Sequence, residues 1–256
     1  MTPLRTDLAA ILALTKRDLV RFARDRSQIA GAIGRPAIWM ILFGNGLHRS
    51  MDGAIGHGVD YRQFVYSGAI AMTILFGGMF QGVTIVWDRE FGMLREVLVA
   101  PISRIAIALG KTCGGAAVTL VQGLAAAAFA PLVGVTLGTG EGIKLLLAMG
   151  VLSLGVTALG VAVGSRMRTF EGFGVISNFV ILPLYFLSGG VFPREGLPEW
   201  MRTLVLLNPI TYGVDLMRAA IGQPHPFPTV LDATLLVGFA LAMCTLAFTS
   251  FRRESH

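Results

Sequence analysis

The chain has 256 residues, of which 54% are hydrophobic and only 14% are charged. Soluble domains carry about 25% charged residues, so this composition excludes an ordinary soluble domain and indicates an integral membrane protein. The formal net charge of +6 does not indicate nucleic-acid binding, because the cations flank apolar segments, as determinants of membrane topology do.

Residues 1–27 predict an amphipathic helix. Thr2 and Pro3 form a favourable start, because a capping hydroxyl precedes a proline at the first helical position. Apolar residues recur every three or four positions from Leu4 to Phe22. The cations that gather toward the far end include Lys16, Arg17, Arg21 and Arg24. This pattern is typical of a helix that lies in the membrane interface with its cations near anionic headgroups.

Residues 28–256 predict a region of six transmembrane helices, which forms a single domain with residues 1–27. About 20 residues at ~1.5 Å rise each cross the ~30 Å hydrocarbon layer. Five segments without Asp, Glu, Lys or Arg meet this need: Gln63–Trp87, Thr112–Gly140, Leu145–Ser165, Gly172–Pro193 and Ala233–Phe251. A first span is expected near Gln28–Leu47, where we expect Arg35 to snorkel toward the near surface.

The distribution of Lys and Arg predicts the orientation of these spans. With both termini inside, thirteen cations lie on the cytoplasmic side and six on the outer side, although the outer loops are longer. Cytoplasmic loops carry the excess of Lys and Arg. The sequence therefore predicts an inner-membrane, multi-pass protein with both termini in the cytoplasm.

The stretch Trp87–Arg104, WDREFGMLREVLVAPISR, is the most charged of the central segments. Its apolar residues, among them Phe91 and Leu94, recur at helical spacing opposite the charges, and Pro101 ends the pattern. We predict a short amphipathic helix on the cytoplasmic side, whose charged face is available to a partner. A solvated loop is the alternative interpretation.

Residues 189–228 form the longest connection. Two apolar segments at helical spacing are separated by prolines and contain Trp200 and Tyr212. This pattern indicates two short helices that dip into the outer leaflet as a re-entrant segment, where protein must bury their broken backbone.

The apolar spans offer little chemistry. Their secure cores contain no carboxylate, and Asp232 lies only at an outer edge, which argues against a proton- or sodium-coupled transporter. We expect neither a catalytic residue nor a metal site: Cys113 and Cys244 lie in separate spans, and Gly110-Lys111-Thr112 lacks the first glycine of a phosphate loop. Energy would have to enter through a partner.

Three glycine pairs at four-residue spacing allow close helix approach. They are Gly78 with Gly82, Gly110 with Gly114, and Gly160 with Gly164. In spans so rich in glycine, we interpret these pairs as sites of tight packing within the chain.

Two stretches give the chain a resemblance to a known family. WDREFGMLREVLVAPISR at Trp87–Arg104, and FLSGGVFPREGLPEW with LNPITYGVDLMR across Phe186–Arg218, are similar to motifs of the type-2 ABC exporter permeases. Members export antibiotics, nodulation factors and polysaccharides. The similarity covers nearly the whole chain, since the order of spans and the amphipathic start also agree.

The resemblance implies a transmembrane subunit that pairs with a second permease copy or a paralogue and docks two cytoplasmic ATPase subunits. ATP and Mg would be bound by those subunits, and no cofactor by this chain. Trp87–Leu98 would be the coupling helix, with its ATPase-coupling interface at Asp88, Arg89, Glu90, Phe91, Leu94, Arg95, Glu96 and Pro101. The outer gate would comprise Pro193, Pro198, Trp200, Asn208, Pro209 and Tyr212. Residues that could line a pathway are Phe76, Phe80, Gln81, Asn178, Phe179 and Tyr185. For the four aromatic residues among them, ordinary packing is the favoured interpretation.

The substrate is expected to be an amphipathic small molecule, a lipid or a lipid-linked product. A polysaccharide or oligosaccharide exporter is the alternative, although the modest aromatic content of the spans argues against a sugar-lined channel. A membrane scaffold that docks a cytoplasmic partner, or a channel, are the alternatives outside ATP-driven transport.

Overall fold

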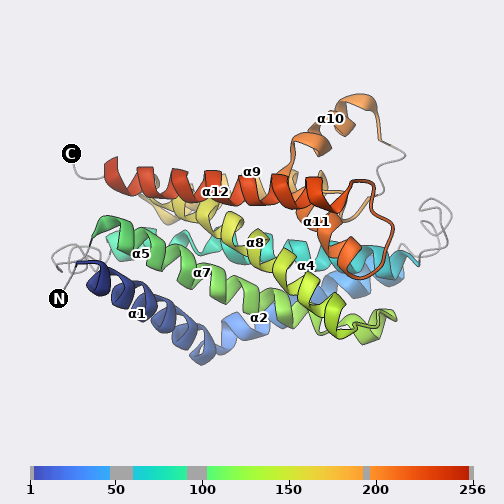
Figure 1. Ribbon diagram of the computed structural model, residues 1–256, viewed down its shortest axis with the longest axis horizontal. Coiled ribbons are helices and arrows are strands. Elements are labelled where there is room, and N and C mark those ends of the chain that lie inside the picture. The colour runs from blue at the N-terminus through green and yellow to red at the C-terminus, as the bar shows by residue number, and fades with distance from the viewer. Residues whose placement is uncertain (1–2, 47–59, 91–102, 193–196, 254–256) are drawn as a thin grey trace.

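The computed structural model describes residues 3–46, 60–90, 103–192 and 197–253, and these residues form helices and no strand. The helices run roughly along one axis as an elongated bundle, with both chain ends at the same end of it (Figure 1). Their bounds are α1 Pro3–Arg24, α2 Arg26–Trp39, η1 Met40–Asn45, α4 Tyr61–Phe80, α5 Val83–Glu90, α7 Arg104–Ala127, η2 Ala130–Val133, α8 Thr139–Gly164, α9 Phe170–Phe186, α10 Glu199–Leu207, α11 Pro209–Ala220 and α12 Thr229–Arg253.

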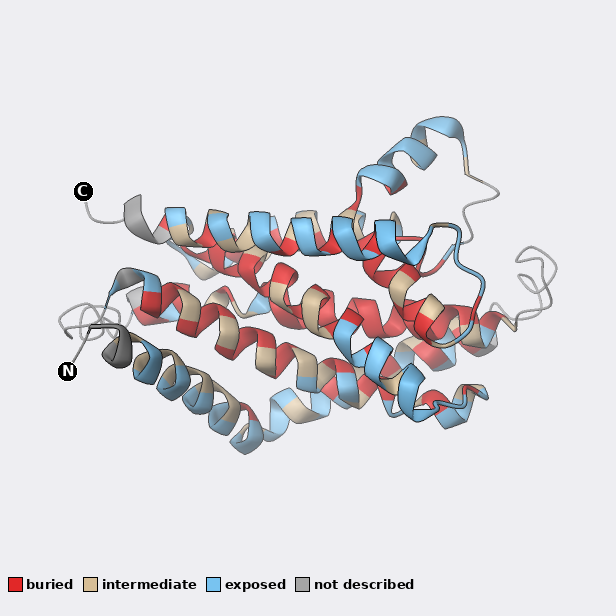
Figure 2. Ribbon diagram, in the orientation of Figure 1, coloured by how far each residue is buried: buried red, intermediate tan, exposed pale blue. Residues whose placement is uncertain are grey.

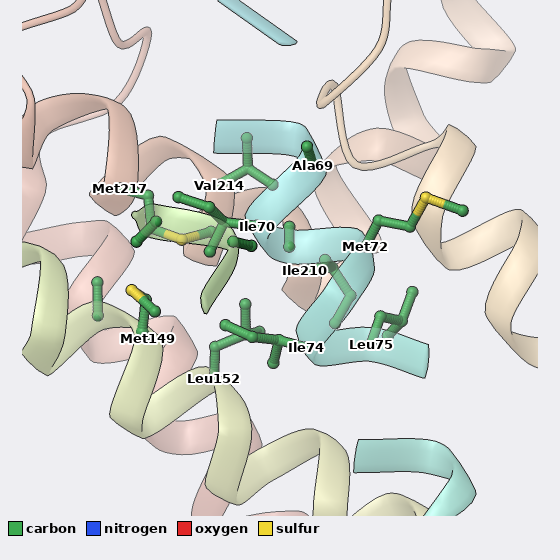
Figure 3. Packing of buried hydrophobic residues seen from close by; sticks show 14 of the residues in the cluster. Ala69, Ile70, Met72, Ile74, Leu75, Met149, Leu152, Ile210, Val214 and Met217 are labelled. Carbon is green, nitrogen blue, oxygen red and sulfur yellow. The ribbon is translucent and has the colours of Figure 1, made fainter. Parts of the chain in front are cut away.

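Helix α4 lies at the centre of the bundle. Nearly every residue from Phe64 to Met79 is buried, because this helix is apolar on all sides and has other helices around it. Ile70 and Ile74 of α4 face Leu152 of α8 and Val214 of α11 in a continuous apolar core (Figure 3). The outer faces of α1 and α12, and most of α10, are exposed (Figure 2).

Glycines bring α4 and α8 into backbone contact. A Cβ atom on Gly82 would lie 2.1 Å from the carbonyl oxygen of Gly160, and a Cβ atom on Gly164 would lie 2.3 Å from the carbonyl oxygen of Gly82. Gly78 also lies against α8, at Val156 and Thr157. The interpretation of these two glycine pairs as sites of tight packing within the chain is confirmed.

Four helical segments are long and apolar enough to cross a membrane: Tyr61–Asp88, Ile105–Ala127, Thr139–Gly164 and Thr229–Ser250. They match the predicted second, third, fourth and sixth spans. The predicted fifth span corresponds to α9, which is apolar but has only 17 residues. The predicted first span corresponds to α2, which contains Pro36, and to the π-helical η1 that continues it. The described chain is therefore a multi-pass membrane protein, and the count of six spans stays a prediction.

The segment before the last span forms two short helices, as its pattern indicated. Asn208 separates them: its side chain accepts a hydrogen bond from the Ile210 N–H (3.0 Å) and donates one to the Leu184 carbonyl (2.7 Å). Helix α11 is buried against the core, whereas α10 projects away from the bundle (Figure 1).

Candidate functional site: the coupling end, an inner pocket and the outer loop

Helix α5 leads into the predicted coupling stretch and is anchored by a buried ion pair. The Lys111 ammonium of α7 donates a hydrogen bond to the Asp88 carboxylate, and both side chains are at most 10% exposed. The resemblance placed Asp88 among the charges that face a partner. Its side chain instead lies inside the protein, because α5 presents it toward α7.

The remaining predicted coupling residues divide into two groups. Glu90 is exposed at the end of α5 and is available to a partner. The residues Phe91, Leu94, Arg95, Glu96 and Pro101, and the side chain of Arg89, lie outside the described residues.

Trp87 marks the side of α5 that is turned toward α1. Its ring meets Phe170 edge-on at 5.8 Å, and the Arg21 guanidinium lies 5.6 Å from its centroid. Arg21 of the predicted interfacial helix therefore contacts the first residue of the coupling stretch.

Helix α1 packs along α7, the helix that follows the coupling stretch. A Cβ atom on Gly110 would lie 2.5 Å from Leu14 Cδ1, and one on Gly114 would lie 2.6 Å from Asp18 Oδ2. The third glycine pair thus forms a groove for α1. This contact confirms tight packing within the chain.

The start of α1 is tied to the start of α7. The Ser103 N–H donates a hydrogen bond to the Asp7 carboxylate at 3.0 Å, while the Ser103 hydroxyl accepts one from the Ala106 N–H at 3.1 Å and caps α7. The backbone N–H of Ser103, followed by its hydroxyl, lowers the pKa of Asp7 from its ordinary value. Helix α1 is thereby fixed at two places on α7.

A pocket of about 400 Å³ lies between α1, α2, α4, α5 and α7. Three of the predicted pathway residues, Phe76, Phe80 and Gln81, line it. Arg35 also lines it, with its guanidinium 4.9 Å from the centroid of Phe76. We expected the Arg35 side chain to snorkel toward the near surface. It packs against α4 instead, because its guanidinium makes a cation–π contact with the ring of Phe76.

The other three predicted pathway residues lie elsewhere. Asn178 and Phe179 are exposed on α9, Phe179 to 80%. Tyr185 is fully buried and meets Trp39 edge-on at 5.8 Å. The structure therefore does not bring the six residues together on one surface.

At the other end of the bundle, the loop after α9 is held from two sides. The Arg218 guanidinium donates to the Gly189 carbonyl at 2.6 Å, and the Tyr61 hydroxyl donates to the Val191 carbonyl at 3.1 Å. A Cβ atom on Gly68 would lie only 2.1 Å from the Gly190 carbonyl oxygen. The loop Gly189–Val191 is thus closed against α4 and α11.

Sequence reasoning missed the buried role of Arg218. It lies 4.0 Å from the centroid of Phe64 and 3.7 Å from Asp215, on the same face of α11. The sequence did contain a pattern that could have predicted this pair. Asp215 and Arg218 are three residues apart, and residues at this spacing are neighbours on a helix.

The predicted outer-gate residues have different environments. Asn208 and Tyr212 are buried, and the Tyr212 hydroxyl donates to the Leu206 carbonyl at 2.5 Å. Trp200 is 66% exposed on α10. Pro198 precedes α10 and Pro209 begins α11, while Pro193 lies outside the described residues.

These features define a multi-pass membrane protein of helices, with the loop Gly189–Val191 packed against α4 and α11 at one end and Glu90 exposed at the end of α5. The chain belongs to the ABC-2 type transporter family, whose model matches residues 9–221. Membership identifies it as a permease of the kind that forms the membrane part of an ABC transporter, and permeases of this family work with an ATPase subunit, usually as dimers.

Relatives over most of the chain are named as transport permeases. The chain is 26% identical to the inner membrane transport permease YadH of Escherichia coli over 246 residues, which is 95% of each chain. It is 32% identical to the inner membrane transport permease YhhJ of Escherichia coli over 177 residues, 67% of this chain and 46% of the relative. It is 25% identical to the transport permease ycf38 of Cyanophora paradoxa over 210 residues, 81% of this chain and 72% of the relative.

Proposed function

We propose that this chain is the transmembrane subunit of an ATP-driven exporter of the inner membrane. Two permease chains would form the translocation pathway, and each would dock one cytoplasmic ATPase subunit that binds ATP and Mg. The chain would cross the membrane six times, with α2–η1 and α9 as its first and fifth spans and both termini in the cytoplasm. The substrate would be an amphipathic small molecule, lipid or lipid-linked product.

The observation that carries this proposal is that both ends of the charged stretch Trp87–Arg104 are held by contacts with other helices. On one side, Asp88 of α5 is paired with Lys111; on the other, Ser103 is bonded to Asp7 and caps α7. Force applied between these points would reach α4 through α5, and α1 through α7. This arrangement supports the stretch as the lever between the ATPase and the spans.

Helix α4 would carry the motion onward. The contacts of Gly78 in α4, and of Gly82 in the turn after it, with Gly160 and Gly164 of α8 leave no room for sliding without separation of the backbones, so α4 and α8 would move as a unit. The closed loop Gly189–Val191 would be the outer gate, and opening would break its bonds to Tyr61 and Arg218.

Charge reversal in the lever tests the proposal. In the permease reconstituted with its ATPase, Glu90→Arg or Arg95→Glu should reduce ATP-dependent transport strongly while the permease still folds and inserts. Arg24→Glu, on the exposed face of α1, is the matched charge-reversal control and should retain transport. Full transport by both lever variants would overturn the assignment of the lever.

A further inference from the structure

The inner pocket has an unusual electrostatic composition for a site beside apolar spans. Two guanidiniums line it, Arg21 from α1 and Arg35 from α2. Among the described residues neither forms an ion pair, since the acidic side chain in the lining, Asp18, is paired with Arg17 at 3.0 Å. The lining therefore carries two guanidiniums against one carboxylate, and that carboxylate is already paired with Arg17.

The two cations occupy different depths. Arg21 and Arg35 lie over the rings of Trp87 and Phe76, which are eleven residues apart, or about 16 Å at ~1.5 Å per helical residue. Arg21 is near the cytoplasmic end of the pocket, and Arg35 lies deeper along α2. At this separation a single headgroup cannot bind both guanidiniums at once. Arg21 therefore lies at the rim of the pocket and Arg35 at its floor.

Arg35 lies where an isolated charge is costly. It is nine residues beyond Arg26, the first residue of α2, which is about 14 Å along the helix axis. A charge at such depth is stabilised when it faces a polar cavity and has a partner. The face of the Phe76 ring, 4.9 Å away, partly stabilises the Arg35 guanidinium, and a bound anion would supply the opposite charge.

The rest of the lining fits a molecule with a polar head and an apolar tail. Thr73, Gln81 and Gln122 offer hydrogen-bonding groups, while Phe80 offers an apolar surface. Helices α1 and α2 meet at an angle whose vertex points away from the bundle (Figure 1), and the pocket lies on the bundle side of that angle.

We propose that this pocket binds the anionic headgroup of an amphiphile from the inner leaflet, with Arg21 attracting it at the rim and Arg35 holding it at the floor. Guanidinium groups suit phosphate and carboxylate oxygens, because their donors form parallel charge-assisted hydrogen bonds. The acyl chains would remain outside, toward lipid. This inference rests on the cytoplasmic orientation of α1 proposed above; it does not depend on the ATPase.

The test measures lipid binding by the isolated full-length permease in detergent micelles. In a Trp39→Phe, Trp200→Phe background, Trp87 in the pocket lining is the single fluorophore. We expect phosphatidylglycerol with brominated chains to quench Trp87 at concentrations where brominated phosphatidylcholine does not. Arg35→Gln should weaken the apparent affinity roughly 10- to 100-fold, the loss expected for one or two charge-assisted hydrogen bonds. Arg21→Gln should weaken it less, and Lys144→Gln, at an exposed position of α8 outside the pocket, should leave it unchanged.

Equal quenching by both lipids, or equal loss in the Lys144 and Arg35 variants, would overturn the proposal. Displacement of the brominated lipid by an equal concentration of inorganic phosphate would also overturn it, because the site would then be one for small anions. If binding is confirmed while the lever variants transport normally, the proposed lever alone fails. If the lever variants lose transport but lipid binding is absent, this inference alone fails.

Discussion

Asp88 and Lys111 join α5 to α7 through a hydrogen-bonded ion pair that lies inside the protein, next to the charged stretch between the two helices. Removing one partner from a buried pair leaves an uncompensated charge, which costs about 3–5 kcal/mol. We therefore expect Lys111→Met to lower the free energy of unfolding by that order, and Asp88→Asn to lower it too. The measurement is thermal or denaturant unfolding of the purified permease.

The control is the double variant Asp88→Asn, Lys111→Met. Because it removes both charges, its loss of stability should be smaller than the sum of the single losses, and a double-mutant cycle measures the coupling energy. Additive losses would show that the pair contributes nothing to the junction of α5 and α7.

The contact of Gly82, in the turn between α4 and α5, with α8 predicts opposite effects for two glycine-to-alanine substitutions. Gly82→Ala would place a Cβ atom 2.1 Å from the Gly160 carbonyl oxygen, and such overpacking costs about 1–3 kcal/mol. Gly150→Ala, in α8, meets nothing within 4 Å and should stabilise by up to about 1 kcal/mol through helix propensity. Unfolding midpoints of the two variants check this; equal shifts would contradict the close contact.

Residue patterns in the sequence predicted the local features of this chain well. The charge-free segments around α4, α7, α8 and α12 form helices of spanning length, and the glycine pairs mark close contacts. These features depend on residues near one another along the chain, where spacing determines which face of a helix they share.

The features that could not be predicted depend on how separate helices pack. Asp88 and Lys111 are 23 residues apart, and nothing in either segment reveals that one carboxylate among several charges is turned inward. Arg35 likewise meets Phe76 only because α2 packs on α4. The coupling interface beyond Glu90 stays a prediction, since its residues lie outside the described part of the chain.

The closed loop Gly189–Val191, at the end proposed to face outward, predicts a change in chemical accessibility. Val191 is fully buried, and Arg218 holds the adjacent Gly189 carbonyl at 2.6 Å. In a chain with Cys113 and Cys244 replaced by alanine, Val191→Cys should react slowly with a membrane-impermeant maleimide added outside. Arg218→Gln removes a charge-assisted bond of about 1.5–3 kcal/mol, so the reaction should accelerate about tenfold or more.

Lys144→Gln, an exposed substitution on α8, is the control for the loss of an outer cation and should leave the rate unchanged. An unchanged rate in Arg218→Gln would contradict the role of this guanidinium in closing the loop. Labelling from the cytoplasmic side alone would contradict the proposed orientation.

The tie between Asp7 and Ser103 predicts a dependence on pH. The Ser103 N–H and hydroxyl favour the charged carboxylate, so the pKa of Asp7 is lower in the folded chain than its unfolded value of about 3.9. A group with a lowered folded pKa contributes stability that is fully present above the unfolded pKa. That contribution is lost as pH falls below about 4 and through the folded value.

We therefore expect the start of α1 to separate from α7 in acid and to stay attached at neutral pH. Hydrogen exchange at the Ser103 amide, which donates to Asp7 at 3.0 Å, reports on this directly. After correction for the intrinsic pH dependence of exchange, protection in the native chain should fall as the pH drops below about 4 and through the lowered pKa of Asp7. Asp7→Asn should show weaker protection at pH 7 and no such fall, because its amide carries no charge. A fall of the same size in Asp7→Asn would assign the transition to another carboxylate.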